Sequence, residues 1–95
     1  MDFLHATWPA PKHIRALTTT RTADLLTLKN TLHLPQEPTW LTQTHSNTCV
    51  RIETNPLREA DASVTQSPMH PLAIKTADCL PIVLCNQAGT AIAAI

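Results

Sequence analysis

Eight prolines and a single glycine, Gly89, restrict this chain of 95 residues more than any other feature. A proline has no backbone N–H and a fixed φ, so it is unfavourable inside a helix and in a central strand except near the strand's start. Turns therefore have to use Pro, Asn, Asp and Thr, and Gly89 is the residue that adopts a positive φ at little cost. The scarcity of glycine also excludes the phosphate-binding loops GxGxxG and GxxxxGKS/T, and with them ATP or NAD binding by those routes.

One segment between the prolines predicts a helix. Leu25, Leu28 and Leu32 recur on one face of a helix of about three turns. Thr22 or Asp24 caps its start, and Pro35 ends it.

Short apolar and β-branched segments predict strands. In residues 48–53, Cys49 and Arg51 share one face while Val50 and Ile52 share the other, as in a half-buried strand. The two apolar segments nearest the C-terminus predict buried strands. The fold class is therefore α+β, dominated by a mixed or antiparallel sheet. The predicted strands are residues 14–20, 48–53, 61–65, 80–85 and 90–95, with residues 40–44 extended.

Composition and charge are those of one small globular domain. Apolar residues make up 43% of the chain, charged residues 15%, and the formal net charge is zero. Without a basic block or an aromatic ladder, neither nucleic acid nor a membrane is expected as a partner. No apolar segment is long enough to cross a bilayer, and residues 1–11 do not form a signal peptide, so a cytoplasmic location is expected. The apolar segment 90–95 ends without a polar residue, which indicates a trimmed chain.

Two of the residues that could carry chemistry are Cys79 and His45. Three cysteines without CxxC spacing do not form a disulfide framework, and Cys49 and Cys85 are expected to pack in the core. Cys79 follows Asp78 at a strand junction, where a thiolate can meet a ligand and where a buried core cysteine is the alternative. His45 and Cys79 could bind one zinc ion, or act as base and nucleophile with Asp78 as orienting acid. Sequence spacing does not choose between these interpretations.

Arg21 and the remaining histidines carry weaker signals. Arg21 ends the TTTR run and could bind phosphate or a carboxylate through its guanidinium, or be an ordinary arginine at a strand end. The other histidines are expected at the solvated surface. They are His5, His13, His33 and His70.

Five sequence elements resemble, in the same order, those of the laccase-domain or YfiH-type family. The QxH element that ends at His45 and the TADCLP element around Cys79 are specific, and the others support them. The elements are WPAP (residues 8–11), TTR (19–21), PTWLTQTH (38–45), ADA (60–62) and KTADCLPIVLC (75–85).

This resemblance implies a layered α+β fold of the YfiH or cytotoxic-necrotizing-factor type. It also implies purine nucleoside phosphorylase and adenosine deaminase activity, with a purine nucleoside and phosphate as substrates. The implied zinc site uses His45, Cys79 and a second histidine that opens an HAGWRG element in the family. Asp78 would support the site, and Arg21 would contact an anion. Copper, from an older reading of the family as polyphenol oxidases, ranks lower because one His and one Cys cannot hold several coppers.

The chain departs from the family pattern at two places. Residues 1–95 match the N-terminal portion of one such domain and stop before the HAGWRG element, so the third zinc ligand has no counterpart. The glycine-rich GGVS stretch that follows TTR in the family is also missing. The isolated chain is therefore expected to show little turnover and to form homo-oligomers through apolar strand edges. A metal-free Cys–His thiol hydrolase or amidase, and a non-catalytic structural remnant, are the alternative functions.

Overall fold

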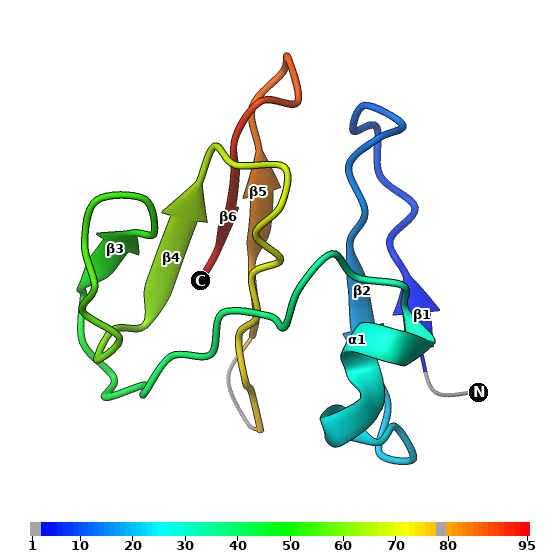
Figure 1. Ribbon diagram of the computed structural model, residues 1–95, viewed down its shortest axis with the longest axis horizontal. Coiled ribbons are helices and arrows are strands. Elements are labelled where there is room, and N and C mark those ends of the chain that lie inside the picture. Colours follow the sequence, from blue (N-terminus) through cyan, green and yellow to red (C-terminus); the bar gives the residue numbers. More distant parts are fainter. Residues whose placement is uncertain (1–2, 78–79) are drawn as a thin grey trace.

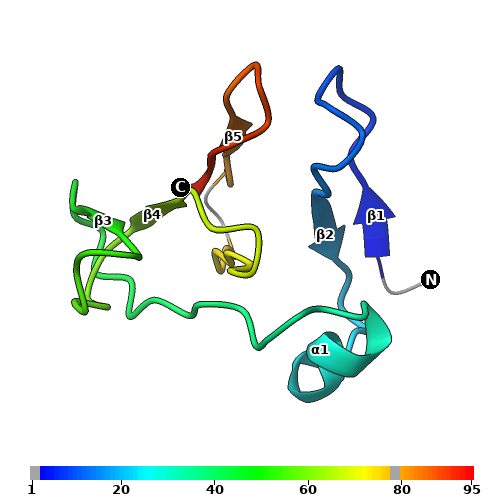
Figure 2. The same ribbon diagram turned by 45° about the horizontal axis from the view of Figure 1, so that its top comes forward.

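The computed structural model describes residues 3–77 and 80–95. Within them, a pair of strands and one short helix lie on one side of the molecule, and a four-stranded sheet lies on the other (Figure 1). The segment between the helix and the larger sheet runs from one side to the other (Figure 2). The strands are β1 (Phe3–His5), β2 (Leu17–Thr19), β3 (Cys49–Arg51), β4 (Ala62–Thr65), β5 (Val83–Cys85) and β6 (Ile92–Ala94).

The larger sheet is mixed, as predicted. Its strand order is β3-β4-β6-β5, with β3 and β4 parallel and the other pairs antiparallel. The smaller sheet pairs β1 with β2 in antiparallel fashion, and β1 has no counterpart among the predicted strands. The combination of one helix with two sheets confirms the expected content of α and β structure. Thr39 and Thr42, in and beside the predicted extended segment 40–44, form only isolated bridges.

The helix starts where its cap was expected but is shorter than predicted. A single 3-10 turn, η1 (Leu25–Thr27), leads into α1 (Leu28–Thr31). The Asp24 side chain accepts a hydrogen bond from Leu26 N at 3.0 Å, which makes Asp24 the N-cap. Leu28 is buried and Leu25 is exposed, so the predicted apolar stripe of about three turns is wrong at its first residue.

The helix ends early because His33 adopts a left-handed backbone conformation, which an α-helix cannot continue through. His33 has a φ of 55°, in the left-handed region. Leu34 N then bonds to Lys29 O at 2.9 Å, and His33 N bonds to Asn30 O at 3.4 Å. These two bonds are those of a Schellman motif, which closes the last turn before Pro35.

The core lies on one face of β3 and its flanking segments. Leu41, Val50, Ile52 and Ala60 form a buried cluster, and Leu72 and Ile74 pack against it. Val50 is 1% exposed, so the alternation predicted for residues 48–53 is confirmed on its apolar face.

Two cysteines are less buried than predicted. Cys49 is exposed, because the same alternation that buries Val50 turns Cys49 to the solvent side with Arg51. Cys85 is half-buried on β5, which is an edge strand with β6 as its partner in the sheet. Both thiols are free, and the expectation of core packing is wrong for both.

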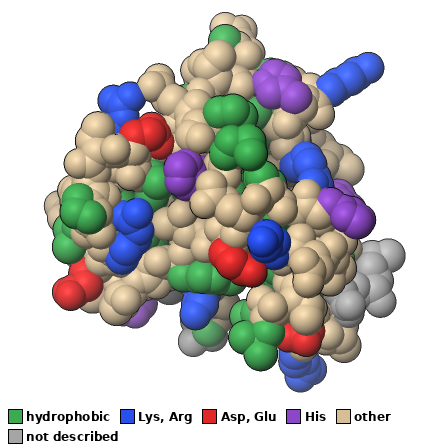
Figure 3. All heavy atoms as spheres, viewed as in Figure 1, with side chains coloured by type: hydrophobic (Ala, Val, Ile, Leu, Met, Phe, Trp, Pro, Cys, Tyr) green, Lys and Arg blue, Asp and Glu red, His purple; other side chains and the backbone are tan. Residues whose placement is uncertain are grey.

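The strand β5 is also exposed where a buried strand was predicted. Val83 and Leu84 are 42% and 49% exposed. An edge strand buries its side chains only if another layer covers it, and the described residues leave these two uncovered. On the face seen in Figure 3, apolar side chains reach the surface in several separate areas between polar groups.

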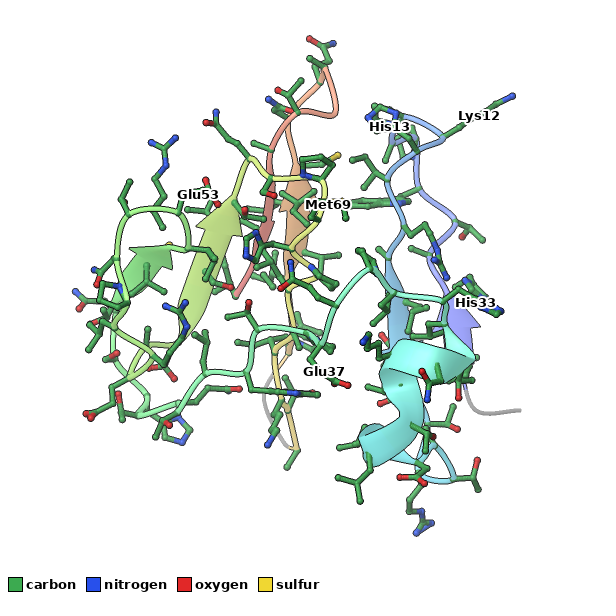
Figure 4. All side chains as sticks on the ribbon, in the orientation of Figure 1. Lys12, His13, His33, Glu37, Glu53 and Met69 are labelled. Atoms are coloured by element: carbon green, nitrogen blue, oxygen red, sulfur yellow. The ribbon has the colours of Figure 1, made fainter. Side chains whose placement is uncertain are left out.

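The turn between β5 and β6 confirms the role predicted for Gly89. Gly89 has a φ of 70°, and its N–H bonds to Asn86 O at 3.1 Å. His13 lies at the tip of the loop that connects β1 and β2 (Figure 4), and its Nε2 is 2.8 Å from Gly89 O. This contact joins the N-terminal strand pair to the larger sheet.

Candidate functional site

His45 lines an open cavity of about 690 Å³. That volume is within the usual range for a small-molecule site. Asp61 and Lys75 add opposite charges to its wall, while Ala77 and Leu80 add apolar surface. The cavity therefore joins the polar loop before β3 to the segment that precedes β5.

The loop that carries His45 is fastened to one carboxylate. Asp61 Oδ1 accepts a hydrogen bond from His45 N at 2.9 Å, and Asp61 Oδ2 accepts from Ser46 N at 2.7 Å and Thr44 N at 3.2 Å. The Ser46 hydroxyl donates to the same Oδ2 at 2.7 Å. His45 has a φ of 58°, the left-handed conformation that lets three successive N–H groups converge on one anion.

These hydrogen bonds keep Asp61 ionised. The N–H and the hydroxyl of Ser46, followed by the N–H groups of Thr44 and His45, hold the pKa of the Asp61 carboxyl well below its ordinary value of 3.8. The Asp61 oxygens are therefore engaged by the loop and are poorly placed to bind a metal as well.

Gln43 ties the same loop to the segment 75–80. Its side-chain amide donates to Lys75 O at 2.8 Å and accepts from Lys75 N at 2.8 Å, across 32 positions of sequence. The Lys75 ammonium lies 5.1 Å from the centre of the Trp40 ring, which adds a cation–π contact between the two segments. The elements PTWLTQTH and KTADCLPIVLC thus meet through their own side chains.

The predicted site residues have different outcomes. His45 lines the cavity, as do Ala77 and Leu80 on either side of Asp78 and Cys79. Asp78 and Cys79 themselves lie outside the described residues, so their meeting with His45 remains a prediction. Arg21 is exposed after β2 and is not among the residues that line this cavity.

The remaining predicted histidines lie away from the cavity wall. His5, His13 and His33 are exposed, as expected. His70 is half-buried, and its Nδ1 is enclosed without a hydrogen-bond partner among the described residues. The expectation of a solvated surface position is therefore wrong for His70.

A metal site is only partly represented in residues 3–77 and 80–95. These residues contain no group of three or more His, Cys, Asp or Glu side chains that could hold an ion. The His45 imidazole is a suitable nitrogen ligand at the cavity wall, and a thiolate at Cys79 would be a suitable second ligand for zinc. The available donor types fit zinc, but residues 3–77 and 80–95 supply no third protein ligand beside His45.

Asp61, Gln43 and Lys75 were given no role from sequence. All three lie in the family elements quoted above. The sequence pattern does not show, however, that the Asp61 carboxylate before β4 binds the loop of His45 before β3. Their partners are 15 to 32 positions away. A polar residue directly before a buried small-residue strand, as Asp61 is, was the available signal.

The chain also matches a known protein family. The model of the family described as multi-copper polyphenol oxidoreductase laccase matches residues 19–95. The chain belongs to this laccase family. Purine nucleoside phosphorylase YfiH of Shigella flexneri is 42% identical over 65 residues, which cover 66% of this chain and 27% of that protein. A purine nucleoside phosphorylase of Pseudomonas aeruginosa is 34% identical, with 92% of this chain and 46% of that protein covered.

A solved structure shares the same fold. The crystal structure of a Neisseria meningitidis protein of the DUF152 family matches with a TM-score of 0.85 and 31% identity. The match covers 99% of this chain and 49% of the Neisseria chain. The chain thus spans about half or less of the length of these laccase-family relatives.

The longer alignments contain gaps. The alignment with the Pseudomonas aeruginosa protein runs over 110 positions, although this chain has 95 residues. That relative therefore carries residues that this member of the laccase family lacks.

Among residues 3–77 and 80–95, no helix has the length and apolar character that a membrane span requires.

Proposed function

We propose that this chain contributes His45 and its cavity to a purine nucleoside phosphorylase. The observation that carries the proposal is that His45 lines the same cavity as Ala77 and Leu80, which flank Asp78 and Cys79. Several relatives are named purine nucleoside phosphorylase, which supports the substrate class. The reaction joins a phosphate oxygen to C1′ of the ribose while the C1′–N9 bond breaks and the purine leaves with its electron pair.

Two residues of this chain would hold a zinc ion at the site. The His45 imidazole and the Cys79 thiolate are the proposed ligands, and a partner chain or another histidine such as His70 would have to supply the third. Bound zinc supplies a Lewis acid that polarises an oxygen and lowers the pKa of water. The same chemistry would support deamination of adenosine as a second activity. Copper is a less suitable metal than zinc, because one histidine and one cysteine cannot hold several copper ions.

The chain's own charged groups would bind and orient the substrates. Lys75 brings a positive charge to the cavity wall, where it can attract phosphate. Asp78 is proposed to orient the zinc ligands, and Arg21 to contact an anion from the turn after β2. We further propose that the layers of the domain follow the cytotoxic-necrotizing-factor type and that the protein works in the cytoplasm.

A zinc titration with a product assay tests this proposal. We expect His45→Ala to weaken zinc binding by about tenfold or more. His33→Ala is the matched control, because His33 is also an exposed histidine with a positive φ but does not line the cavity. Turnover of inosine with phosphate should be slow, because a catalytic zinc normally takes three protein ligands, and His45→Ala should abolish it.

The outcomes separate the alternatives. Equal zinc binding by the wild type and His45→Ala would overturn the proposed ligand. Hydrolysis of an amide or thioester that needs Cys79 but no metal would show a thiol hydrolase instead. A folded chain with neither zinc binding nor turnover would show a structural remnant.

A further inference from the structure

We infer that Asp61 is the positioning residue of the site, which sets the direction in which His45 faces the cavity. This inference rests on the proposed function of His45, but it concerns what holds the histidine rather than what the histidine binds. No role for Asp61 follows from the sequence elements alone.

The first argument is the backbone conformation of His45. Its φ of 58° lies in the left-handed region, which residues with a Cβ adopt only when their surroundings compensate the steric cost. A left-handed residue inside a loop reverses the local path of the chain. The imidazole of His45 therefore reaches the cavity wall only while this conformation is kept.

The second argument is that one carboxylate supplies this compensation. Both oxygens of Asp61 accept from three consecutive backbone N–H groups, those of Thr44, His45 and Ser46. The hydroxyl of Ser46 adds a further bond at 2.7 Å. Charged acceptors form stronger hydrogen bonds than neutral ones. Asp61 is thus the side chain that binds all three of these N–H groups, while Gln43 fastens the start of the same loop to Lys75.

The third argument is that Asp61 itself is fixed. It directly precedes β4, and its N–H donates to Thr48 O at 3.1 Å, just before β3. The neighbouring Ala60 is fully buried, and its N–H donates to Thr42 O at 3.1 Å. A group supported from two strands of a sheet holds a functional side chain more accurately than a loop does.

One consequence concerns the substrate. Three converging N–H groups would otherwise form a binding place for a phosphate. Because Asp61 fills this place with its own negative charge, the substrate phosphate has to bind elsewhere in the cavity, on the side of Lys75.

Asp61→Asn tests this role, with Glu53→Gln as the matched control. Asparagine keeps one acceptor oxygen and puts an NH₂ group where Ser46 N–H now donates. Glu53 likewise accepts a side-chain hydroxyl (Thr65) and a backbone N–H (Gln66), but it lies beside the end of β4 and does not line the cavity (Figure 4). Each variant loses a carboxylate that accepts hydrogen bonds from backbone N–H groups. A general loss of stability should therefore affect both variants.

Two readouts on the full chain separate positioning from stability. The strong intraresidue HN–Hα NOE of His45, which a positive φ produces, should disappear in Asp61→Asn and remain in Glu53→Gln. Zinc ions should shift the imidazole signals of His45 about tenfold less effectively in Asp61→Asn than in Glu53→Gln.

A positive φ and an unchanged zinc response in Asp61→Asn would overturn the inference. If zinc does not shift the imidazole signals of the wild-type His45, the proposed metal function is wrong. The NOE of His45 still shows in that case whether Asp61 maintains the backbone conformation of His45. If Asp61→Asn does not fold, Ser46→Ala, which removes the one hydroxyl bond at 2.7 Å, gives the weaker form of the same test.

Discussion

At the scale of single residues, Gly89 has no room for a side chain unless its neighbours move. Its φ is 70°, and a Cβ would lie 2.5 Å from His13 Nε2 and 3.1 Å from Pro11 Cγ. We expect Gly89→Ala to lower the free energy of unfolding by about 2 kcal/mol, from backbone strain together with the clash. Chemical denaturation followed by circular dichroism measures this loss.

The two causes can be separated by removing the imidazole. In a His13→Ala background the clash at 2.5 Å is relieved, and the strain of the positive φ remains together with the milder contact with Pro11 Cγ at 3.1 Å. The loss caused by Gly89→Ala should then fall to about 1 kcal/mol. An equal loss in both backgrounds would show that the contact between the two hairpins does not limit this position.

Acid is expected to destabilise the chain through Asp61 and Glu53. Hydrogen bonds from Ser46, Thr44 and His45 lower the pKa of Asp61 from 3.8. The Thr65 hydroxyl and then the Gln66 N–H lower the pKa of Glu53 from 4.5. Above a pH of about 5 both carboxyls are ionised in the folded and unfolded chains, so their stabilising effect is complete.

As the pH falls through about 4, the unfolded chain takes up protons that the folded chain does not. The free energy of unfolding therefore decreases until the lowered pKa values of the folded state are passed. Urea midpoints measured from about pH 7 down to about pH 3 check this. The double variant Asp61→Asn with Glu53→Gln should lose less stability over the same interval, and an equal loss would refute the assignment.

At the scale of elements, the end of α1 offers a stabilising substitution. His33 lies beside this end (Figure 4) with a φ of 55°, in the position of a Schellman motif that glycine usually occupies. We expect His33→Gly to raise the free energy of unfolding by about 0.5 kcal/mol. The control Lys29→Gly, inside α1, should lower it by about 0.5–1 kcal/mol. Destabilisation by both would mean that the histidine side chain makes a needed contact.

The elements also show what sequence could and could not predict. Alternation in residues 48–53 identified the buried face with Val50 and Ile52, because a period of two is a local property of a strand. The helix was overestimated because its length depends on the turn at His33, and the burial of Leu25 depends on neighbours far along the chain. Proline and glycine positions, which act locally, predicted the Gly89 turn correctly.

The residues of the candidate site also differ in whether the sequence could identify them. His45 could be singled out because a family element ends on it. The bonds of Asp61 to the loop of His45 could not, because a histidine adopts a positive φ only occasionally and the sequence does not show which histidine does so. The face of a strand and the turn at Gly89 thus follow from local patterns, whereas the burial of Leu25 and of β5 depends on tertiary contacts that the sequence does not show.

At the scale of the whole molecule, apolar surface gathers beside the candidate site. Leu80 is 85% exposed, and it lines the cavity together with Ile95 at the end of the chain. Ile82 and Ile95 pair through two backbone hydrogen bonds of 3.1 and 2.8 Å. Val83 and Leu84 are exposed as well, on opposite faces of the edge strand β5, and the exposed apolar side chains of this edge are called the β5 surface.

The β5 surface is expected to cause self-association of the 95-residue chain. A free strand edge that carries exposed apolar side chains can pair with the edge of another chain. Sedimentation velocity over a range of concentrations should show dimers or larger species. Leu84→Lys places a charge on the edge strand and should weaken association by about tenfold or more.

Leu26→Lys is the matched control, since Leu26 is a highly exposed leucine on η1 rather than on β5. It should leave the association constant unchanged, because removing an isolated exposed leucine uncovers no shared surface. Equal weakening by both substitutions would mean that net charge, and not the β5 surface, controls association. If the chain stays monomeric at every concentration, the edge strand β5 does not bind a second chain and the prediction is wrong.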